Sequence, residues 1–143
     1  MKIIQKIANT LDECINVTYD VPSAHEDGNV PILDVKVKMN NNGKIEYMFY
    51  KKPTSNKLGT LKSSAYSIKN KMTILTQECF RRLHNTSESV NEDIKQNILN
   101  EYMIDLKISG YSEREREDIL RGGINTYTKL KIKETQGIRS FYR

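Results

Sequence analysis

An alternating stretch around a four-residue turn most strongly constrains what this chain can fold into. Apolar side chains occupy every second position on both sides of the turn, at Leu33, Val35, Val37, Met39, Ile45, Tyr47 and Phe49. The polar residues between them would give each strand one buried and one solvated face. Asn40 to Gly43 form the turn, since Asn and Gly tolerate the positive φ that tight hairpins need. The pattern predicts an antiparallel hairpin that stops before Pro53.

The N-terminal residues predict two further elements. Apolar residues recur at helical spacing over about the first fourteen positions. They are Ile3, Ile4, Ile7, Leu11, Cys14 and Ile15. We expect an amphipathic helix that packs on a sheet. The segment Val17–Val21 is typical of a short strand, closed by Pro22 and a polar loop that contains His25.

The chain after the hairpin begins with a basic loop and then has the pattern of helices. The first predicted helix ends near His84, and its apolar face comprises Met72, Leu75, Cys79 or Phe80, and Leu83. The second opens with the capping-box pattern Ser89–Glu92 and stops at Ser109–Gly110, a natural C-terminal cap. Its apolar residues keep nearly helical spacing at Val90, Ile94, Ile98, Tyr102 and Leu106.

The last predicted helix begins at a second capping-box pattern, Ser112–Glu115. The apolar residues that can face the two earlier helices are Ile119, Leu120, Ile124, Tyr127 and Leu130. Only the short segment Ser109–Ser112 separates this helix from the one before, so the two must be neighbours. A helix-turn-helix uses such a turn, and three-helix packing without DNA binding uses it at least as often. We expect Gly122–Gly123 to weaken this helix and to mark a close helix crossing.

Length and composition indicate a small α+β protein. The chain has 143 residues, enough for one compact domain or for a hairpin module joined to a helical one. We divide it into an α/β hairpin module (1–60), a three-helix, helix-turn-helix-like region (61–133) and a basic tail (134–143). Hydrophobic residues make up 37% and charged residues 29%, which predicts a thin core. A fragment or a partner-dependent domain has such a composition.

The positive charge is concentrated in one segment. The net charge is +5, so a polyanion is a reasonable partner. No acidic residue occurs from Lys51 to Gln77, whereas that stretch contains Lys51, Lys52, Lys57, Lys62, Lys69 and Lys71. Solubility alone is the alternative explanation. The basic tail fits a flexible arm that adds affinity, although a solvated chain end explains it more simply.

Cysteine usage and the N-terminus indicate an intracellular protein. Cys14 and Cys79 lie far apart, and the first residues lack the apolar run of a signal peptide. We therefore expect a reducing compartment, either nucleus or cytoplasm. No apolar run approaches membrane-spanning length, so no membrane partner is expected.

The sequence contains no recognisable catalytic arrangement. A metal site at Cys79 and His84 would lack two further ligands. Asp20 and Asp34 could share a magnesium ion, but a strand edge and a solvated strand face explain them better. There is neither a glycine-rich phosphate loop nor a serine nucleophile motif. We therefore expect no enzyme activity, no metal and no cofactor.

The strongest candidate site lies where the hairpin ends. Aromatic residues there can pack against a sugar or base while lysines meet phosphate. The predicted nucleic-acid-binding residues are Phe49, Tyr50, Lys51, Lys52, Thr54, Lys57, Lys62, Arg81 and Arg82. Lysines at an exposed hairpin edge also discourage sheet-to-sheet aggregation, and this structural explanation is equally good.

Several motifs, in order, resemble the reverse transcriptases of Penelope-like and related animal retroelements. Pro31–Val37 followed by Phe49–Thr54 is similar to the end of the palm in that family. Thr73–Thr86 and Lys107–Ser112 are similar to its following helical, helix-turn-helix region. The likeness extends over about Ile3 to Tyr127. It implies that the hairpin corresponds to the primer grip, with residues 49–54 near the primer strand, and that the helices form a thumb-like clamp.

The chain departs from that family where catalysis is concerned. The family's catalytic carboxylates lie in a Tyr-x-Asp-Asp motif and an earlier strand, and this sequence has neither. The expectation is a non-catalytic fragment that binds an RNA–DNA hybrid or duplex DNA through phosphates, with little base specificity and strong salt dependence. The alternatives are a protein-interaction or folding element that docks on the rest of a polymerase, or an inert remnant. A sequence-specific regulator ranks lowest, since the start of the last helix is acidic.

Overall fold

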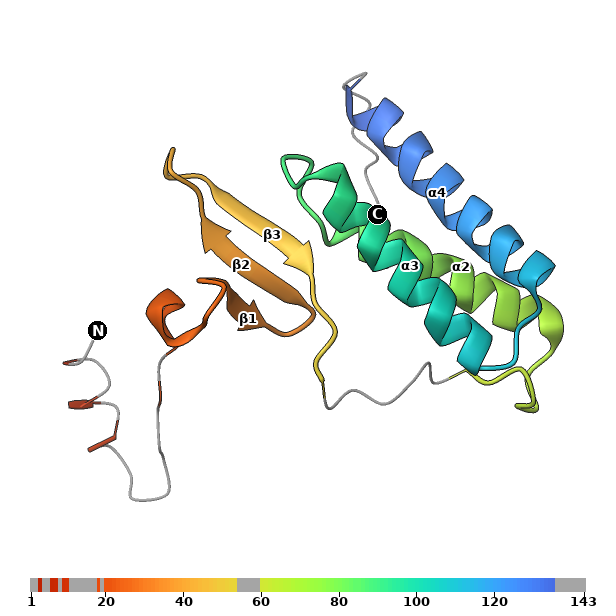
Figure 1. Ribbon diagram of the computed structural model, residues 1–143, viewed down its shortest axis with the longest axis horizontal. Helices are drawn as coiled ribbons and strands as arrows, with labels where there is room; N and C mark the ends of the chain where they lie inside the picture. The colour runs from red at the N-terminus through yellow and green to blue at the C-terminus, as the bar shows by residue number, and fades with distance from the viewer. Residues whose placement is uncertain are drawn as a thin grey trace.

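The described part of the chain folds into a small antiparallel sheet beside a bundle of three helices (Figure 1). The computed structural model describes residues 20–53 and 60–135 together with residues 3, 6, 7, 9, 10 and 18. This arrangement confirms the predicted α+β class. The predicted N-terminal helix and the basic tail lie largely outside the described residues. The strand predicted at 17–21 is wrong where the structure describes it, because Thr18, Asp20 and Val21 are not in a strand. A short 3-10 turn, η1 (Pro22–Ala24), leads into the sheet.

The sheet has three strands in the order β1 (Val30–Ile32), β2 (Val35–Met39) and β3 (Ile45–Phe49). Strands β2 and β3 form the predicted hairpin, whose turn contains Gly43 at φ 73°. Strand β1 was not predicted from the sequence. The prediction that Leu33 lies in a strand is wrong. Leu33 lies in the two-residue turn between β1 and β2, at φ 54°.

The outer edge of β3 is covered by the loop that follows helix α2 (Ile68–His84). The backbone N–H of Tyr47 donates to Ser87 Oγ at 2.8 Å, and the Ser87 N–H donates to the Tyr47 carbonyl at 2.8 Å. Farther along, the N–H of Phe49 donates to Thr86 Oγ1 at 3.2 Å. The opposite edge of the sheet is β1, with Pro31 at its centre. These bonds join the sheet to the bundle through its backbone.

The three helices are α2 (Ile68–His84), α3 (Glu92–Ile108) and α4 (Glu113–Thr135). All three were predicted, although α4 extends beyond the expected boundary at residue 133. The capping box expected at Ser89 is wrong. Asn91 caps α3 instead, by accepting a hydrogen bond from the Asp93 N–H at 3.0 Å.

The turn between α3 and α4 satisfies the backbone groups of both helix ends. The Tyr111 N–H donates to the Leu106 carbonyl, the Gly110 N–H donates to the Lys107 carbonyl, and Gly110 has φ 92°. This is a Schellman cap. The second predicted capping box is confirmed, because Glu115 accepts from the Ser112 N–H at 2.8 Å and the Glu115 N–H donates to Ser112 Oγ at 3.4 Å.

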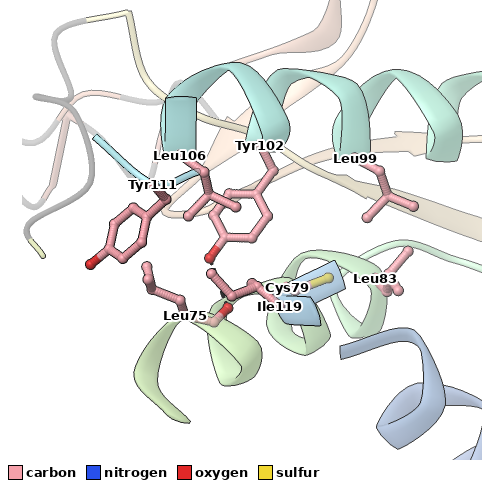
Figure 2. Close-up of a cluster of buried hydrophobic side chains, with 8 residues drawn as sticks. All are labelled: Leu75, Cys79, Leu83, Leu99, Tyr102, Leu106, Tyr111 and Ile119. Atoms are coloured by element: carbon pink, nitrogen blue, oxygen red, sulfur yellow. Dashed lines mark hydrogen bonds between the residues drawn. The ribbon is translucent and has the colours of Figure 1, made fainter. Parts of the chain in front are cut away.

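The hydrophobic core lies between the helices and involves little of the sheet (Figure 2). It consists of Leu75, Cys79, Leu83, Leu99, Tyr102, Leu106, Tyr111 and Ile119. The Tyr102 hydroxyl donates to the Leu75 carbonyl at 2.7 Å, so α3 is tied to α2 inside the core. The predicted close crossing is present, since α4 packs on α2 with Gly122 against Thr76 and Gly123 against Cys79.

The predicted burial of one sheet face is wrong for most of that face. Met39 is 70% exposed and Ile45 is 66% exposed, although both lie on the apolar side of the hairpin. The reason is that α2, α3 and α4 lie at the β3 edge of the sheet, where Arg81 and Arg82 of α2 pack on Phe49 and leave Met39 and Ile45 uncovered.

Candidate nucleic-acid interface

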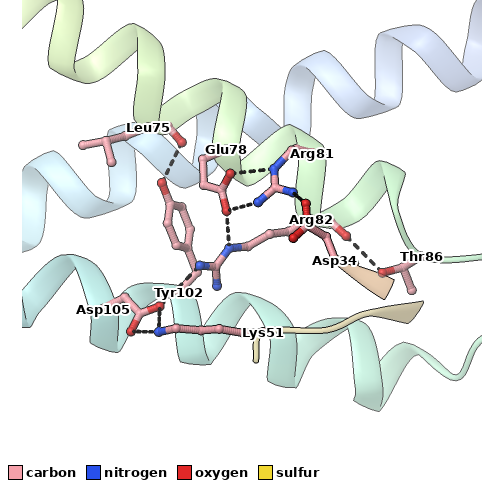
Figure 3. Close-up of polar contacts among 9 residues, drawn as sticks. All are labelled: Asp34, Lys51, Leu75, Glu78, Arg81, Arg82, Thr86, Tyr102 and Asp105. Atoms are coloured by element: carbon pink, nitrogen blue, oxygen red, sulfur yellow. Dashed lines mark hydrogen bonds and ion pairs between the residues drawn. The ribbon is translucent and has the colours of Figure 1, made fainter. Parts of the chain in front are cut away.

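A charged junction holds the sheet against the bundle, and Arg82 lies at its centre (Figure 3). Its guanidinium carbon lies 4.8 Å from the ring centre of Phe49 and 4.3 Å from that of Tyr102. Its nitrogens donate to Glu78 at 3.0 Å and to Asp105 at 3.3 Å. Arg82 is only 3% exposed. An arginine suits this position, because its planar guanidinium can stack between two aromatic rings while it donates hydrogen bonds to carboxylates in its own plane.

Two further basic residues complete the junction. Lys51, just beyond β3, donates to both carboxylate oxygens of Asp105 at 2.8 and 2.9 Å. Arg81 bonds Glu78 through two nitrogens and also reaches Asp34 in the β1–β2 turn. Glu78 raises the pKa of the Arg81 guanidinium above its usual value, with a smaller contribution from Asp34. Together these pairs connect α2 and α3 to the sheet.

Four of the nine predicted site residues are therefore engaged within the protein: Phe49, Lys51, Arg81 and Arg82. Their charges are balanced by the carboxylates of Glu78, Asp105 and Asp34. Removing one partner of a buried charge pair leaves the other charge uncompensated, which destabilises the fold. These pairs therefore hold the sheet in place against α2 and α3. The arrangement indicates that the junction is structural and offers Arg82 to no external phosphate.

Tyr50 lines a separate groove between the sheet and α3. The Lys36 ammonium lies 5.0 Å from the Tyr50 ring centre and also bonds Asp27. The groove has a volume of about 320 Å³ and is lined by Asp27, Lys36, Met48, Phe49, Tyr50, Lys51, Ile94, Asn97, Ile98 and Glu101. The positive charges of Lys36 and Lys51 on its walls are balanced by the negative charges of Asp27 and Glu101. The groove therefore has no net positive charge that would attract a polyanion.

The loop at 60–67 lies across one end of the bundle, where α2 begins and α3 turns into α4. The buried ammonium of Lys71 donates to the carbonyls of Lys62 and Ser64 at 2.6 and 2.7 Å. The Lys62 N–H donates to the Ser109 carbonyl at 3.0 Å, and the Tyr111 hydroxyl donates to the Thr60 carbonyl at 3.0 Å. Part of the acid-free segment is thus fixed onto the bundle.

This end of the molecule presents several exposed cations, and we call it the basic end. Its exposed basic residues are Lys52, Lys62, Lys69, Lys107 and Arg114. Lys62 pairs with Glu115 at 2.7 Å, whereas Lys52, Lys69 and Lys107 have no acidic partner among the described residues. The cations without an acidic partner thus follow β3 or lie on α2 and α3, whereas α4 carries Glu113 and Glu117 close to Arg114 in sequence.

Seven of the nine predicted residues are described, and they are divided among three places. Phe49, Lys51, Arg81 and Arg82 meet at the junction, and Tyr50 lies in the neighbouring groove. Lys52 and Lys62 belong to the basic end. Thr54 and Lys57 lie outside the described residues. Three residues of the junction were not predicted from the sequence: Glu78, Asp105 and Tyr102. The spacing of residues along the chain does not indicate that Asp105 lies beside Lys51 in the fold.

No group of three or more His, Cys, Asp or Glu side chains is placed to hold a metal ion in the part of the chain that the structure describes. No described helix is long and apolar enough to cross a membrane. The Cys79 thiol is buried, and its pKa is raised to about 11 mainly by desolvation, so it is a core residue.

Comparison with known proteins supplies no relative. No protein-family model matches the chain, and neither a curated protein nor a solved structure is significantly similar to it.

Proposed function

We propose that the chain is a non-catalytic module that binds the backbone of a nucleic acid without sequence specificity. The observation that carries the proposal is the basic end, where the loop at 60–67, a part of the acid-free segment, is fixed across the termini of three helices. Exposed lysines without acidic partners gain free energy by displacing counterions from phosphates. Such contacts position a nucleic acid and do not discriminate between bases.

The contact surface in this proposal is smaller than the set of residues predicted from sequence. The junction cations are neutralised inside the protein, with Arg82 3% exposed and Lys51 held by both oxygens of Asp105. Breaking those pairs to reach a phosphate would leave buried carboxylates unpaired, which costs several kcal/mol. Lys52, Lys69 and Lys107 can bind a phosphate without such a loss.

The proposal includes an origin as a truncated reverse transcriptase of a retroelement. Its support is the order of the motifs from Pro31–Val37 through Lys107–Ser112 in the sequence. In that case the basic end would belong to the thumb-like clamp behind the primer grip. An RNA–DNA hybrid and duplex DNA are the substrates to compare first.

The decisive experiment compares two triple variants of equal charge. The first replaces Lys52, Lys69 and Lys107 at the basic end by Gln. The matched control replaces three exposed lysines elsewhere, Lys44, Lys129 and Lys133, by Gln. Binding of labelled RNA–DNA hybrid and duplex DNA of two unrelated sequences is measured across a salt series.

We expect the basic-end variant to bind all four ligands more weakly and with a shallower salt dependence, by about 0.9 in the logarithmic slope for each lost phosphate contact. The control should retain most of the wild-type affinity. Equal losses in both variants would show that net charge alone governs binding. No binding by the folded wild-type protein at low salt, or loss for one sequence only, would refute the proposal.

A further inference from the structure

One face of the sheet is apolar throughout. Side chains alternate between faces along a strand, and cross-strand partners share a face. The observed register therefore brings eight residues to the same face: Val30, Ile32, Val35, Val37, Met39, Ile45, Tyr47 and Phe49. The opposite face carries Lys36, Lys38 and Glu46 and is the polar one.

The described part of the chain covers only one end of this apolar face. Phe49 packs under the guanidinium groups of Arg81 and Arg82. Met39 and Ile45, at the other end, are 70% and 66% exposed, and Ile32 on the edge strand β1 is 51% exposed. Scattered exposed apolar residues are normal, but a contiguous face on a three-stranded sheet is typical of a surface that something covers.

A segment with the apolar spacing of an amphipathic helix precedes the sheet in the same chain. Residues 1–17 carry apolar side chains at helical spacing, and the two that the structure describes, Ile3 and Ile7, are 75% and 58% exposed. The Thr10 N–H and hydroxyl both donate to the Ile7 carbonyl, which forms a turn there. Only the loop that contains η1 separates this segment from β1.

The dimensions of such a helix and of the apolar face agree. Three strands spaced at about 4.8 Å match the width of one helix, which is about 10–12 Å across with its side chains. Fourteen helical residues would span about 21 Å, and a five-residue strand spans about 17 Å. One amphipathic segment of this length therefore suffices to cover the face.

We propose that the N-terminal segment, residues 1–17, covers the apolar face of the sheet with its own apolar side chains. The segment then completes a second small core on the side of the sheet that the bundle leaves open. This surface is separate from the basic end, so nucleic-acid binding and this docking can fail independently.

The native Cys14 allows a direct test in the full-length chain. Single cysteines are introduced on the face as Ile32→Cys, Met39→Cys or Ile45→Cys, and each protein is treated with a short bismaleimide. The matched control is Ile104→Cys, which places a thiol at an equally exposed apolar position on α3, where Ile104 is 57% exposed. Cys79 stays unreactive in all variants, because it is fully buried and its thiol pKa is raised.

We expect an intramolecular cross-link from Cys14 to at least one face position, and none to the α3 control, in protein that sediments as a monomer. Cross-links that form only between two chains would show that a second copy covers the face and would overturn the proposal. Absence of any cross-link, in folded protein whose Cys14 reacts with a simple maleimide, would also overturn it and would leave the face to a different protein.

Discussion

Gly123 on α4 lies in direct contact with Cys79 on α2, so closely that no side chain fits between them. A Cβ at Gly123 would lie 2.5 Å from both the Cβ and the Sγ of Cys79, and 3.1 Å from the Thr76 carbonyl oxygen. The two helices approach at this point because one of them lacks a side chain.

Replacing Gly123 by Ala should therefore destabilise the bundle although alanine is the better helix former. The gain in helix propensity is about 1 kcal/mol, and forcing α2 and α4 apart should cost about 1–3 kcal/mol or more. Chemical unfolding followed by circular dichroism measures the net change. Gly122→Ala in a Thr76→Ala background is the control, since the atoms that its Cβ would meet at 2.9 and 3.4 Å are then gone. Stabilisation by Gly123→Ala would contradict the close crossing.

Asp105→Asn should be the most damaging single change at the junction. Asp105 is 8% exposed and serves two cations, Lys51 and Arg82. Breaking a buried pair from one side costs about 3–5 kcal/mol, because the charge that remains is uncompensated. Lys51→Met should cost clearly less, since Asp105 keeps Arg82 as a partner. Urea unfolding measures the loss of unfolding free energy in both variants. Equal losses would argue against a carboxylate of Asp105 that is shared by Lys51 and Arg82.

The capping box of α4 should make stability depend on pH in the acidic range. Hydrogen bonds from Lys62 and then from Ser112 lower the pKa of Glu115 from 4.5 to about 2. A carboxyl group whose pKa is lower in the folded state stabilises the fold above its unfolded pKa. That contribution is lost as the pH falls from about 4.5 toward about 2. In Glu115→Gln the loss of unfolding free energy over this range should be smaller than in the wild type.

Removing Lys62 tests the same ion pair from the other side. Lys62→Met deletes the hydrogen bond that contributes most to the lowered pKa of Glu115. It should therefore reduce the acid dependence of the unfolding free energy as well. If the acid dependence in Glu115→Gln equals that of the wild type, the ion pair between Glu115 and Lys62 does not stabilise the fold over this pH range.

The turn between β1 and β2 should be open to stabilisation. Leu33 has φ 54° and is 77% exposed, so it bears the strain of a left-handed backbone without burying its side chain. For an L-residue that conformation costs about 1–2 kcal/mol, a cost that glycine avoids. Leu33→Gly should raise the free energy of unfolding by about 1 kcal/mol. Leu33→Ala, which removes the side chain but keeps a Cβ, should give no such gain in the same thermal or urea assay.

Local chemistry made much of the fold predictable. The Asn-rich turn that ends in Gly43, the cap at Ser109–Gly110 and the pairing of Ser112 with Glu115 each depend on residues within a few positions of one another. Gly122–Gly123 was informative because two glycines inside a helix weaken it unless a neighbouring backbone needs the space. The prediction of Ser89 as a cap failed because Asn91, two residues later, is an equally good acceptor.

The candidate site was less predictable, because its contacts join residues that are distant in sequence. Basic residues near aromatics predicted a surface, but Arg82 is only 3% exposed and faces Tyr102 and Phe49. Its neighbour Arg81 is 41% exposed in its side chain. Adjacent arginines on a helix point in different directions, and charge alone does not reveal which of them meets solvent.

The way the sheet ends at its two margins affects how copies of this protein can associate. On one margin, the side chains and backbone of Thr86 and Ser87 already occupy hydrogen-bonding groups of β3. On the other, Pro31 removes a donor from the middle of a three-residue strand. A foreign strand therefore has no continuous ladder to extend at either side. Growth of fibrils by strand addition is disfavoured even while the apolar face is uncovered, so association at high concentration should give soluble oligomers rather than amyloid.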